Sequence, residues 1–381
     1  MSRLIQVYLM RYSLFILLAL ILSACTTKPP VLIGFAAELT GKNGEMGINL
    51  RNGVQLAIEE NNAAGGIGGR KIHLLVEDDF GTPQGALNAE NKLIAAGVVA
   101  IIGHFTSDQT MVGYSVAEAK GVVLLSATAS TSLLSGKNDL FFRTVASTDA
   151  MGRGLASYIH GKRGIARIAT IHDLDNKTYA EPLLRSFLES FTSLGGEVID
   201  QLEFSAAKAP DYSPLVDDLK KTDAAGVLII ASPYDTAMIA QTISLKKWQP
   251  VLFISSWAQG QALFQSGGQT VEGMETVMAF DSNDPSPALA QFKSTYEKRF
   301  SAAPIFTGME GYETMRLLAA ALQKTNGNSD GLAESLAGMQ KFEGLTGPIS
   351  MDKFGDVIRP LVIQKVKDGK FETIEKLNPE Q

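Results

Sequence analysis

The feature that most constrains the fold of this chain is the alternation of short apolar, β-branched runs with longer helical patterns. The runs form two series, at residues 31–35, 71–76, 98–103 and 122–125, and then at 167–173, 197–204, 226–231 and 251–255. Continuous apolar runs are typical of parallel strands that helices cover on both faces of a sheet. Two such series predict an α/β fold with two doubly wound, Rossmann-like lobes.

Helical patterns separate these runs along the chain. In the first of them, Leu50, Val54, Ala57 and Ile58 recur on one face at helical spacing. Further patterns cover residues 86–96, 108–119, 179–194, 212–221 and 236–246. A third block combines strand 273–280, helices 286–300 and 307–324, strand 347–352 and a final hairpin over 361–374. Since the helix–helix part of this block, before the final hairpin, does not look like an independent domain, we expect that part to complete the first lobe.

The first 25 residues form a pattern that is typical of an exported protein. Arg3 and Arg11 precede an apolar run at 14–22, and small residues lead from this run to Cys25, the single cysteine of the chain. A positive segment, a short apolar segment and small residues, in this order, predict a secretory signal peptide over residues 1–24. The apolar run is about nine residues long, whereas a membrane-spanning helix needs roughly 20.

The residues that lead to Cys25 resemble a bacterial lipobox. The sequence is Leu22-Ser23-Ala24-Cys25, and lipidation would make Cys25 the first residue of the mature chain. Two or three acyl chains, at about 0.8 kcal/mol per buried CH₂, would hold the protein stably on a membrane surface. Plain secretion is the alternative, and Met10 is an alternative start to Met1. We therefore expect a membrane-anchored lipoprotein of the periplasm or cell envelope.

Composition and motifs exclude several classes of function. The formal charge is −6, or −8 without the two arginines of the signal, and no basic block suits the chain to nucleic acid. With Cys25 lipidated, no thiol remains for a disulfide, a metal or a nucleophile. The histidines, which are His73, His104, His160 and His172, show no metal-ligand spacing, and no Gly-x-Ser-x-Gly motif occurs. We expect no catalytic residue, no metal and no cofactor, and hence no enzyme.

Two loops carry the candidate binding residues. Residues 103–110 connect an apolar run to a helical pattern, and Thr106 and Ser107 place hydroxyls and free amides at the start of that helix. Such a site favours an anion, for example a carboxylate. Residues 126–132 follow the next run and are again small and hydroxylated. Both loops come at carboxyl ends of strands, where open α/β sheets bind ligands. The alternative is ordinary N-capping, in which Ser107 or Asp108 serves only its own helix.

At these loops the chain resembles the periplasmic leucine/isoleucine/valine-binding proteins, the type I solute-binding subunits of ATP-driven amino-acid importers. The matching stretches are GFAAELTG at 34–41, AGGIGGRK at 64–71, EDD at 77–79 with Pro83, IGHFTS at 102–107, LLSATAS at 124–130, FRT at 142–144, and residues 347–355. The likeness extends from residue 31 to near the C-terminus, and the order and spacing of these motifs together are specific to the family.

The resemblance implies two lobes that close by hinge bending on a ligand held in the cleft between them. It places three crossovers between the lobes, near residues 143–148, 279–283 and 350–352. The implied division is a signal peptide over 1–24, a lipid-tethered linker over 25–30, a first lobe of 31–145 plus 281–350, and a second lobe of 146–280 plus 351–381.

The resemblance also assigns roles to residues of the two loops. Ser107, with nearby amides, would hold the α-carboxylate of the ligand, and the loop containing Thr128, Ala129 and Ser130 would contact the α-ammonium. Tyr179 of the second lobe would close over the ligand. The expected ligand-binding set is Met46, Phe105, Thr106, Ser107, Thr128, Ala129, Ser130, Tyr179, Tyr234, Asp235 and Trp257.

Three features of the family pattern are missing, at four positions. The acidic partner of the ammonium aligns with Trp257, an aromatic wall residue aligns with Met46, and the early disulfide is absent because Gly81 and Thr106 stand in its places. A buried ammonium without a counter-charge is costly. Either Asp235, beside Tyr234, replaces that acid, or the ligand carries no ammonium.

Aromatic side chains complete the expected site. Phe105, Tyr179, Tyr234 and Trp257 would offer flat apolar area to an aromatic or large aliphatic ligand.

We therefore expect a monomeric, extracytoplasmic solute-binding lipoprotein that delivers a small carboxylate-bearing ligand to an ABC permease and its ATPase. A hydrophobic, branched-chain or aromatic amino acid is the expected ligand, and an amine-free aromatic or aliphatic acid is the alternative. A ligand sensor, or a regulator that acts by protein contact, would use the same fold and remains open at this point.

Overall fold

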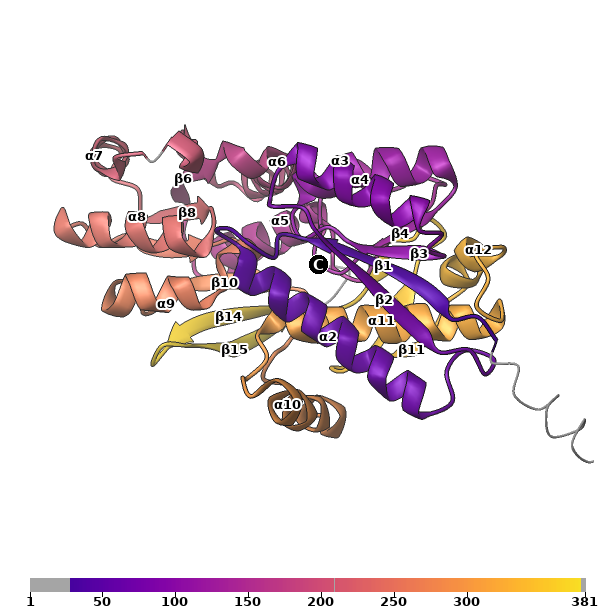
Figure 1. Ribbon diagram of the computed structural model, residues 1–381. Coiled ribbons are helices and arrows are strands. Elements are labelled where there is room, and N and C mark those ends of the chain that lie inside the picture. The colour runs from indigo at the N-terminus through magenta and orange to yellow at the C-terminus, as the bar shows by residue number, and fades with distance from the viewer. Residues whose placement is uncertain (1–27, 209, 378–381) are drawn as a thin grey trace, which may run out of the picture.

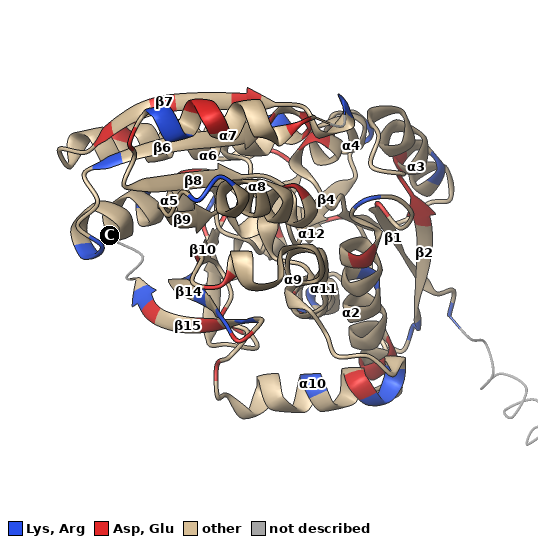
Figure 2. Cartoon of the chain, turned by 90° about the vertical axis from the view of Figure 1, so that its left-hand side faces the viewer, with Lys and Arg blue, Asp and Glu red and all other residues tan. Residues whose placement is uncertain are grey.

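The computed structural model describes residues 28–208 and 210–377 (Figure 1). The expected signal peptide and Cys25 lie outside the described residues. Within these two ranges, no helix combines the length and the apolar character that crossing a membrane requires. In the view of Figure 2, acidic and basic residues are interspersed over the outer helices and edge strands.

The first sheet has five parallel strands in the order β2-β1-β3-β4-β5. They span Val31–Ala37 (β1), Ile72–Asp78 (β2), Ala100–Gly103 (β3), Val123–Ser126 (β4) and Phe141–Arg143 (β5). Its strands are apolar on both faces because successive side chains enter different cores. Ile102 packs in one core with helix α2 (Gly44–Ala63), whereas Ile101 packs in another with α3 (Pro83–Ala95) and α4 (Ser107–Lys120).

The second sheet has seven strands in the order β15-β14-β10-β9-β8-β6-β7. Its parallel strands are β6 (Arg167–Asp173), β7 (Glu197–Phe204), β8 (Gly226–Ile230), β9 (Val251–Ile254) and β10 (Glu275–Met278). The hairpin of β14 (Leu361–Lys367) and β15 (Lys370–Leu377) joins β10 in antiparallel fashion. One face packs on α5 (Thr148–Ala156) and α6 (Lys177–Ser193), and the other on α7 (Tyr212–Lys221), α8 (Pro233–Leu245) and α9 (Gln261–Gly267).

The block after β10 packs largely with the first sheet. It consists of α10 (Pro287–Phe300), α11 (Phe306–Lys324), α12 (Leu332–Ala337) and the small antiparallel sheet of β11 (Phe342–Glu343), β12 (Pro348–Met351) and β13 (Val357–Ile358). Helix α11 lies against α2, and Figure 1 shows the first sheet and the second sheet on opposite sides of the molecule. Short helical turns are η1 (Ser132–Leu134), η2 (Ser157–Lys162), η3 (Leu174–Asn176), η4 (Ala206–Lys208), η5 (Ser256–Ala258) and η6 (Gly268–Val271).

The predicted fold class is confirmed, since two doubly wound lobes with parallel sheets are present. The helical patterns missed α5, which contains Gly152 and Gly154 and therefore has low intrinsic helix propensity. The glycines allow α5 to pack closely against its neighbours. A Cβ atom at Gly152 would lie 2.8 Å from the carbonyl oxygen of Leu183 on α6, so only glycine permits this close approach of the two helices.

Candidate functional site

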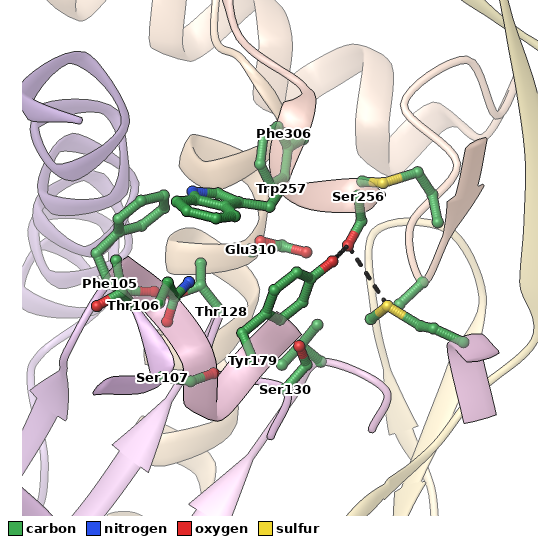
Figure 3. A pocket seen from close by; sticks show the side chains of 15 residues that line it. Phe105, Thr106, Ser107, Thr128, Ser130, Tyr179, Ser256, Trp257, Phe306 and Glu310 are labelled. Carbon is green, nitrogen blue, oxygen red and sulfur yellow. Dashed lines mark hydrogen bonds between the residues drawn. The ribbon is translucent and has the colours of Figure 1, made fainter. Parts of the chain in front are cut away.

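A cavity lies where the carboxyl ends of strands from the two sheets meet. About 500 Å³ around it is free of protein atoms, a volume that includes space open to solvent. The loops after β3 and β4 line it from one side, and the loop after β6, helix α6 and the turn after β9 line it from the other. The structure brings seven of the predicted residues to this cavity, namely Phe105, Thr106, Ser107, Thr128, Ser130, Tyr179 and Trp257 (Figure 3).

The N-terminus of α4 forms one end of the cavity. Thr106 is the N-cap, and its hydroxyl accepts a hydrogen bond from the Gln109 amide. Asp108 instead accepts a hydrogen bond from the Thr178 amide of α6 at 3.2 Å. Capping therefore does not require Ser107, which is only 2% exposed and lines the cavity. A hydroxyl beside the first-turn amides of a helix is suited to hold an anion.

The loop after β4 is tied to the loop after β3. The Thr128 hydroxyl donates a hydrogen bond to the Phe105 carbonyl oxygen at 2.7 Å, and the Ser126 hydroxyl accepts one from the Ala129 amide at 2.9 Å. The Thr128 side chain thus aligns the two loops, while Ser130 adds a further hydroxyl to the cavity wall. Ala129 is buried and does not line the cavity.

A buried histidine, His104, connects the loop after β3 to helix α3 and the residues before it. His104 lies between two carboxylates, with Nδ1 2.6 Å from Asp79 Oδ2 and Nε2 3.3 Å from Glu90 Oε2. Burial by itself lowers the pKa of this histidine, but its hydrogen bonds to the two carboxylates and their charges raise the pKa to about 9. The imidazolium form of His104 therefore holds α3 and the start of the β3–α4 loop together at neutral pH.

Aromatic side chains form the opposite wall. The Tyr179 hydroxyl is 3.1 Å from the Ser256 hydroxyl, and the Tyr179 and Trp257 rings meet edge to face with centroids 5.9 Å apart. Within the described part of the chain, the buried Nε1 atom of Trp257 has no hydrogen-bond partner. Phe105 and Phe306 add apolar surface to the same cavity. This wall offers stacking area together with one unpaired donor.

Sequence reasoning missed eight of the residues that line the cavity, and Glu310 is the charged one among them. Glu310, on α11, is 4% exposed, and its Oε2 atom has no hydrogen-bond partner among the described residues. Burial raises the pKa of Glu310 to about 8, with the negative charge of Glu313 adding to the effect and the positive charge of Arg359 opposing it. The available signal was an acid in a helix segment rich in apolar residues and glycine, because acids are rarely buried without a partner.

Besides Ala129, the structure places three predicted residues outside the cavity. Met46 is buried, its carbonyl oxygen accepts a hydrogen bond from the Thr307 hydroxyl of α11 and its side chain lies near Gly260, whereas Tyr234 is 47% exposed. Asp235 accepts hydrogen bonds from the Tyr212 and Ser232 hydroxyls and pairs with Lys42. Since Ser232 is the N-cap of α8 and Asp235 lies three residues later, the two form a capping box that turns the carboxylate away from the cavity.

Comparison with known proteins gives consistent matches over almost the whole chain. Residues 30–370 match a family described as periplasmic binding protein. Leu/Ile/Val-binding protein homolog 1 of Brucella abortus (strain 2308) is 27% identical, over 91% of this chain and 93% of its own length.

Two solved structures share the fold. The leucine binding protein LivK of Thermotoga maritima superposes with a TM-score of 0.86 at 22% identity, covering 92% of this chain and 99% of its own. A solute binding protein of an ABC transporter from Rhodopseudomonas palustris BisB5, in complex with 3,4-dihydroxy benzoic acid, gives a TM-score of 0.81 at 23% identity, with 92% and 98% covered.

Proposed function

The chain belongs to the periplasmic binding protein family, and from this premise we propose that it captures a small carboxylate-bearing ligand in the cavity between its two sheets. The observation that carries the proposal is the pairing of an anion site with an apolar wall. Ser107 is the first residue of α4, and the Tyr179 and Trp257 rings line the same cavity. Proteins of this family bind solutes and are not enzymes, in agreement with the expectation from sequence.

Each group in the cavity has a proposed role. The Ser107 hydroxyl and amide hold the carboxylate, with Ser130 as a further hydrogen-bonding group. The unpaired Nε1 of Trp257 donates to a polar atom of the ligand. The rings of Phe105 and Tyr179 cover its apolar body. Such a division between a few polar groups and a mainly apolar lining is typical of small-ligand sites.

We also propose that the two sheets form the cores of two lobes that close on the ligand. The first lobe comprises residues 31–145 and 281–358, and the second comprises residues 146–280 and 359–377. The chain passes from one sheet to the other after β5 and returns after β10, which supports the first two crossovers. Because β13 pairs with β12, its pairing favours a third crossover at 359–360, after the expected 350–352.

Delivery and anchoring complete the proposal. Closure would present both lobes to an ABC permease, and lipidation of Cys25 would keep the protein at the membrane where that permease works. The Brucella relative is named as a Leu/Ile/Val-binding protein, and the Rhodopseudomonas neighbour holds an aromatic acid, so both ligand classes are within reach of this fold. A Cys25→Ser protein should leave the membrane fraction, and unchanged membrane association would contradict the anchor.

A thermal-shift screen tests the binding function. The protein would begin at Thr26, retain every described residue, and be freed of ligand by denaturation and refolding. The panel would contain the twenty amino acids, benzoates, phenylpropanoids and short-chain fatty acids. A ligand at 100 times its dissociation constant adds about 2.7 kcal/mol to stability, which shifts the unfolding midpoint measurably. Stabilisation by at least one of these carboxylates is expected, and a flat response across the panel would contradict the proposal.

A further inference from the structure

We infer that Glu310 is the counter-charge for a cationic amine on the ligand, so that this cavity selects amino acids over amine-free acids. The inference rests on the proposed function, because it assumes that a carboxylate-bearing ligand enters this cavity. It assigns the second charged end of the ligand to a residue of α11, and not to the α8 residue Asp235 considered from sequence.

The position of Glu310 is the first argument. Of the described residues that line the cavity, Glu310 is the one with an acidic or basic side chain. Its carboxyl group lies among the labelled aromatic side chains in Figure 3, and its Oε2 atom is buried without a hydrogen-bond partner. A buried acceptor that is left unpaired is costly, so a ligand donor at this point would remove a penalty already present in the empty cavity.

The charge balance around Glu310 is the second argument. Arg359 is the neighbouring cation, but its guanidinium already donates to Glu313 Oε1 at 2.7 Å and to the Thr144 carbonyl oxygen at 3.0 Å. Arg359 and Glu313 thus neutralise each other, and both are buried. Ionised Glu310 would leave one uncompensated negative charge in this group. An ammonium ion in the cavity would balance it.

The two ends of the cavity together define the ligand. The helix N-terminus at Ser107 favours a carboxylate, and Glu310 favours an ammonium, so a zwitterion satisfies both ends. An amine-free acid binds only at the Ser107 end. Glu310 then either stays protonated or, if it is ionised, repels the ligand carboxylate. The aromatic wall of Tyr179 and Trp257 then selects the apolar side chain of the amino acid.

Asp235 does not compete for this role. Its carboxylate is engaged by the Tyr212 hydroxyl, the Ser232 hydroxyl and the Lys42 ammonium, and it lines a different, superficial pocket with Tyr234. The Asp235 carboxylate thus has three partners, whereas the Glu310 Oε2 atom has none among the described residues. Glu310 is therefore the carboxylate that can pair with a ligand.

The test uses ligand pairs that differ only in the amine. L-phenylalanine is compared with 3-phenylpropanoate, and L-leucine with 4-methylpentanoate, by isothermal titration calorimetry at pH 7. We expect the wild-type protein to bind the amino acid of at least one pair and to prefer it over its amine-free partner. Glu310→Gln should weaken binding of that amino acid at least tenfold and leave binding of the amine-free acid unchanged or stronger. Glu334→Gln, which changes an exposed acid of α12, is the matched control and should leave both affinities unchanged.

A second measurement needs no variant and remains decisive if Glu310→Gln fails to fold. Because the pKa of Glu310 is about 8 in the empty cavity, an ammonium ligand that binds at pH 7 must drive a proton off this carboxyl group. Titrations in buffers of different ionisation enthalpy should show net proton release with an amino acid and none with its amine-free partner. The other titratable groups that face Glu310 should not contribute to this proton release. Glu313 and Arg359 remain paired with each other, and burial raises the pKa of the Tyr179 hydroxyl, so it stays protonated.

The outcomes separate this inference from the proposed function. Equal binding of the amino acid by wild-type and Glu310→Gln proteins, or a wild-type preference for the amine-free acids, would overturn the inference alone. Failure of both ligand pairs and of the benzoates to bind the wild-type protein would overturn the proposed function, and this inference with it.

Discussion

Ser107 combines two features at a single residue, a hydroxyl in the cavity and a place at the first turn of α4. Ser107→Ala removes the hydroxyl but leaves the Thr106 cap and the helix intact. A hydrogen bond to a charged group contributes about 1.5–3 kcal/mol, so the dissociation constant for any carboxylate ligand should rise roughly 10- to 150-fold. Calorimetry with an amino acid and an amine-free acid would measure this. Wild-type affinity in the variant would remove Ser107 from the anion site.

His104 makes the stability of the protein depend on pH. Its pKa is near 6.5 in the unfolded chain and about 9 in the fold, so its charged form stabilises the protein fully below pH 6.5. This contribution is lost as the pH rises from 6.5 through 9, and it amounts to something on the order of 3 kcal/mol. Urea unfolding of the wild-type protein should therefore show a falling free energy of unfolding over this interval.

The matched variant for this prediction is His104→Asn, which cannot be charged. The pKa of Glu310 is also raised, from 4.5 to about 8, and this shift lowers stability with rising pH in the same direction. The difference in slope between wild-type and His104→Asn proteins between pH 6.5 and 9 is thus the diagnostic quantity. Identical slopes would show that the Asp79–His104–Glu90 group does not carry the expected charge.

Single residues also show how far sequence reasoning could reach the site. Ser107 and Thr128 were predictable because they follow strands directly, and a strand end fixes their place on the sheet edge. Glu310 was not, since it reaches the cavity only through the packing of α11 against α2. Asp235 also follows a strand end, but its carboxylate bonds to Ser232, the N-cap of α8, and does not reach the cavity. A residue's place after a strand therefore does not predict two effects that decide which side chains reach the cavity. These effects are the packing of helices and the capping of helix ends.

At the level of elements, the contact between α2 and α11 positions Glu310. The two helices approach so closely that a Cβ atom at Gly53 would lie 1.9 Å from the Gly308 carbonyl oxygen. Gly53→Ala should force the helices apart, and the loss of packing, about 1–3 kcal/mol, should exceed the gain in helix propensity of up to about 1 kcal/mol. Thermal unfolding would show a lowered midpoint.

The control for this prediction is another helical glycine with open space around it. A Cβ atom at Gly161 of η2 would meet no atom within 4 Å, so Gly161→Ala should leave the midpoint unchanged or slightly raised. If both variants behaved alike, the close approach of α2 and α11 would not be a determinant of stability. A weakened affinity in Gly53→Ala, beyond the loss of stability, would show that this helix contact also positions the cavity wall.

The whole molecule was largely predictable from the order of loosely matching motifs and alternating elements. The predicted family and the predicted two-lobed α/β fold are both confirmed. The periodicity of apolar residues was sufficient to predict long helices and strands with a clear apolar face. It did not lead to a prediction of α5, in which glycines lower the helix propensity and allow close packing. The relative position of the lobes depends on contacts between distant segments, which no local pattern contains.

One such contact is the pairing of Lys42 with Asp235. Lys42 follows β1 of the first sheet, whereas Asp235 lies on α8 against the second sheet, so the ion pair spans the two proposed lobes. If the proposed lobes close by hinge bending, an ion pair across the cleft would favour closure on every ligand alike. Lys42 is partly exposed, which limits the contribution of the pair to about 1 kcal/mol or less.

Lys42→Met should accordingly weaken binding of amino acids and of amine-free acids by the same factor, up to roughly fivefold. Asp235 keeps its hydrogen bonds from Tyr212 and Ser232 in this variant, so its stability should remain close to that of the wild-type protein. Calorimetry with L-phenylalanine and 3-phenylpropanoate would measure both affinities. A uniform loss is expected from a closure contact, whereas the loss in Glu310→Gln is expected for the amino acid alone. A selective loss in Lys42→Met would instead place Lys42 and Asp235 in ligand recognition.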